Sequence, residues 1–172
     1  MSILDRENDK LLYAFLKANE EEYRMTISSA SIPNSFEDFR LDLEKDFETG
    51  KEIQFVVFKE GVLVGTIYVY NIHDKWNLSG FYSKEVRKTR IPFLTIVVTL
   101  EYIRDNLYGS EIFFSTYQEN VEMNSIAQRT GVFENVRIGM SSKRVVNEYR
   151  VSLDSLAHVS KLKSIMLARF SD

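Results

Sequence analysis

Residues 76–117 decide the fold, and they read WNLSGFYSKEVRKTRIPFLTIVVTLEYIRDNLYGSEIFFSTY. Residues 76–83 and 111–117 have the length and residue types of strands. Between them, apolar residues from Phe93 to Leu107 recur at steps of three and four, which is the helical period. A strand that reaches the next strand through a helix makes a right-handed crossover and a parallel pair. The stretch therefore predicts a sheet with a parallel pair and a helix packed across it.

A basic segment, residues 84–90, joins the first strand to the helix and holds four cations and one acid. We expect a loop here, with Pro92 opening the helix, because the first helical position needs no backbone N–H. Gly109 stands where a left-handed cap would end the helix. Cations at a helix N-terminus favour an anion site, most naturally for a phosphate. The alternative is a solvated face, the usual fate of a charge run.

Composition limits the class of protein. The 172 residues suit one domain, and 44% hydrophobic with 27% charged residues is a globular balance. A net charge of −3 argues against a nucleic-acid partner. The absence of cysteine and the presence of two histidines argue against disulfides and a metal site. The N-terminus lacks the apolar core of a signal peptide and no apolar run could span a bilayer, so we expect a soluble, cytoplasmic protein without membrane partners.

The flanking segments complete the expected domain. We expect helices at residues 8–22, 35–50, 121–130 and 155–170, a loop at 28–34, and strands at 53–58, 62–72, 136–140 and 148–153. Hairpin turns at 59–61 and 73–75 make the first three strands antiparallel. Ser35 with Asp38 three residues later is a helix N-cap pattern. Gly65 inside its strand predicts a bulge or a close backbone approach.

This order of elements resembles the GNAT superfamily, acyltransferases that use acetyl-CoA. The resemblance implies a mixed α/β fold in one domain spanning residues 1–172. Its central sheet would be mostly antiparallel with one parallel strand pair, and helices would cover both faces.

The resemblance extends to the basic segment. In the family this loop reads Arg or Gln, two residues, Gly, one residue, then Gly or Ala, and its amides hold the CoA pyrophosphate. Here Arg87 matches the first position, but Arg90 and Pro92 replace the two small residues. Pro92 has no N–H and Arg90 adds a side chain where phosphate approaches closely, although cationic side chains can bind phosphate themselves. The implied phosphate-binding residues are Arg87, Lys88, Thr89, Arg90 and Ile91.

A second match follows residue 117. Asn120 and Gly131 have the family's spacing, and the resemblance implies that Asn120 contacts CoA. Many members carry a tyrosine seven residues after this Asn, where it protonates the departing thiolate. This chain has Ala127 there, like branches that acetylate protein N-termini or nucleotide-linked sugars.

The resemblance also implies how the acyl group is held. The main chain of Phe81, Tyr82 and Ser83 would pair with pantetheine where the parallel strands splay, and amides there would polarise the thioester. The alternative is that these are ordinary sheet residues.

An attacking amine must also lose a proton. The candidate bases are Asp74, Tyr117, Glu119 and Tyr149. Each has a structural or surface role as its alternative. We favour Tyr117 because it ends a strand beside the expected splay, with Asp74 as the second choice.

The sequence thus favours transfer of an acetyl or other short acyl group from acetyl-CoA to a primary amine, by direct attack. The acceptor would be a small-molecule amine or a peptide N-terminus, and the protein a monomer or homodimer. The alternative is a non-catalytic GNAT-fold module that binds a ligand or a protein partner, which Arg90, Pro92 and Ala127 favour.

Overall fold

The computed structural model describes residues 1–5, 7–27, 31–50, 52–73, 75–107, 111–130, 133–141 and 144–152. The strands are β1 Ser2–Ile3, β2 Glu52–Lys59, β3 Val62–Ile72, β4 Lys75–Tyr82, β5 Glu111–Tyr117, β6 Phe133–Ser141 and β7 Arg144–Ser152. The helices are α1 Asp9–Ala18, α2 Glu20–Thr26, α3 Phe36–Glu48, α4 Lys84–Arg87, α5 Ile91–Asn106 and α6 Val121–Thr130.

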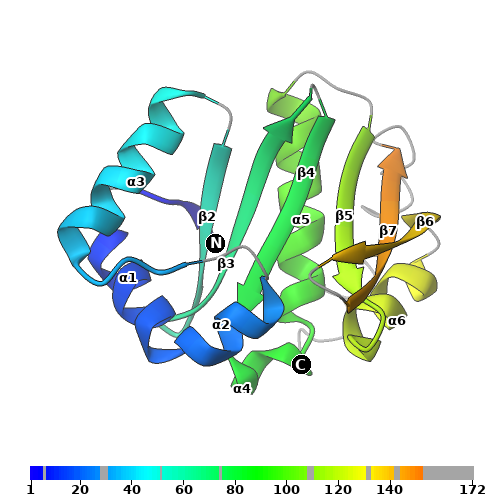
Figure 1. Ribbon diagram of the computed structural model, residues 1–172, viewed down its shortest axis with the longest axis horizontal. Coiled ribbons are helices and arrows are strands. Elements are labelled where there is room, and N and C mark those ends of the chain that lie inside the picture. The colour runs from blue at the N-terminus through cyan, green and yellow to red at the C-terminus, as the bar shows by residue number, and fades with distance from the viewer. Residues whose placement is uncertain are drawn as a thin grey trace.

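One seven-stranded sheet organises the described residues, in the order β1-β2-β3-β4-β5-β7-β6. The β4–β5 pair is parallel, and the other neighbouring pairs are antiparallel. Helices α1, α2 and α3 cover one face of the sheet and α5 covers the other (Figure 1). The expected mixed α/β fold with a parallel pair is confirmed.

Two apolar cores lie on the two faces, and strand β4 contributes to both. Leu78 and Tyr82 pack with α5, whose buried residues Ile96, Leu100 and Ile103 follow the helical period. Phe81 points to the other face, where it meets the rings of Phe15 on α1 and Tyr23 on α2 at centroid distances of 5.8 and 5.3 Å. This alternation is the period of two expected of a strand buried on both faces.

The N-terminal helix is interrupted. The prediction of one helix over residues 8–22 is wrong at Asn19, which separates α1 from α2. The Asn19 side chain donates to the Phe15 carbonyl at 2.8 Å, and its backbone N–H bonds Leu16. Asparagine side chains compete with the helical ladder in this way. The predicted Ser35 cap is confirmed, since its Oγ accepts the Asp38 N–H at 3.1 Å.

The turns agree with the sequence. Glu60 and Gly61 have φ of 52° and 80°, the left-handed values that a two-residue hairpin turn requires. At Gly65 the sequence predicted a bulge or a close backbone approach, and the structure shows both. The β2–β3 register shifts between Val57 and Phe58, opposite Gly65, and a Cβ on Gly65 would lie 2.5 Å from Tyr82 Cδ1.

Three predicted boundaries differ. Residues 84–87 form one turn of helix, α4, where a loop was expected, because Val86 is buried against the core. Helix α5 begins at Ile91, so Pro92 is its second residue. The final strands are longer than expected, since pairing in the β6–β7 hairpin satisfies their backbone groups in spite of polar residues. Asp74, Gly109, Gly131 and the expected helix at 155–170 lie outside the described residues.

We expect Gly65→Ala to lower the free energy of unfolding by about 1–3 kcal/mol, because the new methyl group would overlap the buried Tyr82 ring and crowd the Phe81 carbonyl. Gly139→Ala is the matched control, since a Cβ there meets Val146 only at 3.6 Å. Urea unfolding measures both. Equal midpoints for the two variants would contradict the close approach.

Candidate functional site

The site lies where β4 and β5 separate. The two strands pair at Trp76 with Ile112 and at Asn77 with Phe113, and no further β4–β5 pair follows among the described residues. Strand β4 nevertheless stays paired to β3 as far as Tyr82, and β5 stays paired to β7 as far as Tyr117. The carboxyl ends of the parallel strands therefore form a fork, which is the splay that the sequence predicted.

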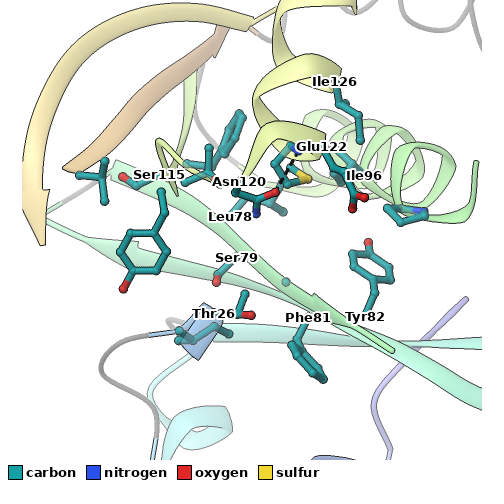
Figure 2. A pocket seen from close by; sticks show the side chains of 18 of the residues that line it. Thr26, Leu78, Ser79, Phe81, Tyr82, Ile96, Ser115, Asn120, Glu122 and Ile126 are labelled. Atoms are coloured by element: carbon teal, nitrogen blue, oxygen red, sulfur yellow. Dashed lines mark hydrogen bonds between the residues drawn. The ribbon is translucent and has the colours of Figure 1, made fainter. Parts of the chain in front are cut away.

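A cavity of about 650 Å³ fills the fork. Figure 2 shows Ser79 of β4 between Thr26 of α2 below and three residues above it, Ser115 of β5, Asn120 just before α6 and Glu122 of α6. The β4 residues Leu78, Ser79, Gly80, Phe81 and Tyr82 and the β5 residues Phe114, Ser115, Thr116 and Tyr117 all line it. The cavity extends past the sheet on both sides, towards α5 and α6 on one and towards α2 and the β6–β7 hairpin on the other.

The backbone of β4 presents hydrogen-bonding groups to the fork. The Ser83 N–H donates to the Val64 carbonyl on β3 at 2.8 Å. Because bond directions alternate along an antiparallel strand, the N–H and C=O groups of Gly80 and Tyr82 face β5 instead. Of the three predicted backbone sites, Tyr82 is directed into the fork while Phe81 and Ser83 bond towards β3. Gly80 was missed, and only knowledge of the register could have identified it.

Arg87, expected to bind phosphate, is engaged inside the protein. Its Nε donates to the Tyr82 carbonyl at 2.7 Å, and its Nη2 lies 2.5 Å from a carboxylate oxygen of Glu22. Its guanidinium also lies 5.1 Å from the centre of the Phe81 ring. Arg87 therefore ties α2 to the end of β4, at the edge of the cavity.

The start of α5 offers few backbone donors. The Ile91 N–H already bonds the Thr89 hydroxyl at 3.2 Å, and Pro92 has none. Among the first three residues of α5, this leaves only Phe93 with a backbone N–H that is neither missing nor bonded to Thr89. Lys88 and Arg90 are exposed beside it. The cationic side chains, more than the amides, give this end of the site its attraction for anions.

The turn from β5 into α6 is fixed by two asparagines. Asn120, a predicted cofactor residue, caps α6 by accepting the Met123 N–H at 3.2 Å. Asn124, which the sequence analysis missed, donates to the carbonyls of residues 117, 118 and 120 at 2.8 to 3.2 Å. Its carbonyl oxygen accepts the Tyr149 hydroxyl at 2.8 Å. Tyr149, a candidate base, is thus 1% exposed and committed to this network.

Tyr117 lines the cavity and its ring is covered. The Arg144 guanidinium lies 3.4 Å from the ring centre, and no described residue hydrogen-bonds its hydroxyl. Glu119, another candidate base, is paired with Arg144 at 2.7 Å. A hydrogen bond from its own backbone and the bond from Arg144 lower the pKa of Glu119, so it stays ionised and paired.

The other tyrosines near the fork are less suited to proton transfer. The Tyr82 hydroxyl is hydrogen-bonded to Thr95 at 2.5 Å, and burial raises its pKa. Burial, followed by the charge of Glu52, raises the pKa of Tyr70 on the opposite wall. Ala127 is fully buried in the core and does not line the cavity.

One perturbed carboxyl escaped the sequence analysis. Glu52 pairs across the sheet with Tyr70, and burial, with Asp46 as the second cause, raises its pKa to about 7. No local motif marks it, because its surroundings come from α3 and β3.

Metal and membrane sites find no support in the described part of the chain. It contains no group of three or more His, Cys, Asp or Glu side chains that could hold a metal ion. None of its helices has the length and apolar composition needed to cross a bilayer.

Solved structures share this fold. A ribosomal L7/L12 α-N-protein acetyltransferase in complex with coenzyme A has a TM-score of 0.77 and 12% identity, with 90% of this chain and 93% of that chain covered. A Vibrio cholerae spermidine N-acetyltransferase in complex with CoA and spermine has a TM-score of 0.74 and 15% identity, covering 90% and 95%. A Vibrio fischeri ribosomal-protein-S5-alanine acetyltransferase has a TM-score of 0.73 and 13% identity, covering 90% and 92%.

These similarities define the class of fold. A Streptococcus pneumoniae structure described as an acetyltransferase of the GNAT family matches as well, at a TM-score of 0.67. The chain therefore has the GNAT fold, as its element order suggested. A scan of protein-family models and a search of curated protein sequences each find no match.

Proposed function

We propose that this protein transfers a short acyl group from acyl-CoA, in the first place acetyl-CoA, to a primary amine. The observation that carries the proposal is the β4–β5 fork, with one cavity that is lined by residues from both faces of the sheet. A donor and an acceptor can enter such a cavity from opposite sides and meet between the strand ends. The structural neighbours described as acetyltransferases support the same class of reaction.

The residues at the fork suit CoA at two places. The N–H groups of Gly80 and Tyr82 face the gap, where an extended pantetheine chain could pair with them as a strand would. Lys88 and Arg90 stand at the start of α5, where phosphates would be bound by side-chain cations in place of the missing Pro92 amide. Arg87 would act indirectly, by fixing the Tyr82 backbone.

CoA supplies a thioester, whose carbonyl carbon is open to attack by an amine. In the transfer a C–N bond forms, the C–S bond breaks, and a proton passes from the nitrogen while another reaches the departing sulfur. A backbone N–H at the fork would stabilise the developing oxyanion. Tyr117, the candidate base favoured from the sequence, is our proposed proton-transfer residue: its hydroxyl takes the proton from the nitrogen and passes its own to the sulfur. Tyr117 lines the cavity, and its hydroxyl is not committed to any described residue.

A non-catalytic GNAT-fold module is the second candidate. The buried Ala127 in place of the family's tyrosine and the Arg90 and Pro92 substitutions favour it. Such a module would bind CoA or another ligand without turning it over, so binding and turnover must be measured separately.

We expect acetyl-CoA to bind the wild-type protein, and Arg90→Ala to weaken binding at least about tenfold. A charge-assisted hydrogen bond contributes about 1.5–3 kcal/mol, and about 1.4 kcal/mol corresponds to a factor of ten. Isothermal titration calorimetry measures both, with Arg104→Ala, an exposed arginine in the last turn of the same helix, as the control. CoA without its 3′-phosphate shows whether that group contributes. If the wild type gives no heat with millimolar acetyl-CoA, the proposal is wrong.

We expect Tyr117→Phe to lower kcat about a hundredfold while leaving the Kd for acetyl-CoA within about twofold, because the change removes the hydroxyl that transfers the proton and little volume. Tyr102→Phe is the control, because Tyr102 of α5 packs against Phe55 and does not line the cavity. Unchanged turnover in Tyr117→Phe would exclude this residue as the proton-transfer group.

A further inference from the structure

The half of the cavity on the α2 side of the sheet has two walls. The end of α2, with Met25 and Thr26, forms one wall together with Ile27. The start of β7, with Arg144 and Val146, forms the other. We call the opening between these five residues the mouth.

Arg144 crosses the mouth. Its Nη1 donates to the Met25 carbonyl at 2.7 Å, which joins the β7 wall directly to the α2 wall. Its Nε donates to Glu119 at 2.7 Å, and its guanidinium covers the ring of Tyr117. One side chain thus contacts α2, the turn after β5, and β5 itself. It closes part of the space through which a molecule would approach the fork from this face.

The charges of this half of the cavity are neutralised within the protein. Glu119 is paired with Arg144, and Glu148 is paired with Arg137 at 3.1 Å. The third carboxylate that lines the cavity, Glu122 of α6, lies beside Asn120 and Ile96 on the α5 side of the sheet (Figure 2). The α2 side therefore offers no further carboxylate among the described residues to hold the additional ammonium groups of a polyamine. The remaining lining includes Met25, Ile27, Tyr70, Tyr117 and Val146, whose surfaces suit an apolar chain.

We propose that Arg144 is a specificity-determining residue that narrows the mouth, so that the acceptor is a slender monoamine with an uncharged, apolar body. This inference rests on the proposed function, and it adds the acceptor class and the residue that selects it. A bulky body would have to displace the Arg144 bonds to Met25 and Glu119. A polyamine whose body lies on the α2 side of the sheet would leave its second and third charges without partners there, which a desolvated site penalises.

The test compares wild type with Arg144→Ala at saturating acetyl-CoA. Hexylamine is the slender probe, an amine with a branched, bulky body is the second, and spermidine is the third. Wild type should prefer hexylamine by at least about tenfold in kcat/KM over the other two. Arg144→Ala should raise the ratio of kcat/KM for the bulky amine to kcat/KM for hexylamine about tenfold, a ratio in which any common effect on turnover cancels. The kcat/KM for spermidine should rise little, because Arg144→Ala frees only one carboxylate, that of Glu119.

Arg150→Ala is the matched control. Arg150 lies on β7 with 37% of its side chain exposed, against 38% for Arg144, and is likewise paired with glutamates, but it does not line the cavity. Its amine profile should equal that of the wild type. An unchanged profile in Arg144→Ala, or a wild-type preference for spermidine, would overturn the inference.

A second readout needs no turnover. Amide hydrogen exchange in residues 20–27 should be faster in Arg144→Ala than in Arg150→Ala, because only the first change releases the Met25 carbonyl. Equal exchange in the two variants would refute the claim that Arg144 narrows the mouth by joining β7 to α2, whether or not any amine is acetylated. The opposite result is also informative. If acetyl-CoA does not bind or no amine reacts, but exchange in residues 20–27 responds as expected, the proposed function is wrong while the narrowing of the mouth by Arg144 is supported.

Discussion

The β4–β5 pairing is the constraint on which the rest of the structure depends. Two residue pairs hold the parallel strands together, and antiparallel partners on the outer sides keep both strands hydrogen-bonded while they diverge. The gap leaves strand backbone directed at no other strand, which a folded protein tolerates only where another partner satisfies it. A ligand with an extended amide-bearing chain fits that requirement, and the cavity lies directly beside this part of β4.

Contacts from distant parts of the chain hold the fork open. Arg87 ties the end of β4 to α2, while Asn124 ties the turn after β5 to β7. Arg144 then joins β7 to α2 on the far side of the cavity. Each of these three side chains links elements that flank the gap, so hydrogen bonds join the walls of the cavity to one another.

The fold could be predicted because its signals are local, whereas much of the site could not. The period of residues 93–107 and the β-forming run at 111–117 predicted α5, β5 and their parallel partner. A single helical turn such as α4 has no period to detect. Arg144 and Asn124 act on partners 119 and 25 residues away, which no local pattern shows. The resemblance to the GNAT loop implied a phosphate role for Arg87, but the nearby Glu22 carboxylate became visible only in three dimensions.

The most direct test of this account is residue-resolved amide exchange in β4 with and without acetyl-CoA. The account predicts that the cofactor slows exchange at Gly80 and Tyr82, whose N–H groups face the fork. Exchange at Phe81 and Ser83, whose N–H groups bond to β3, should change much less. Equal effects at all four residues, or no effect when acetyl-CoA is bound, would contradict the claim that the open backbone of β4 holds the cofactor.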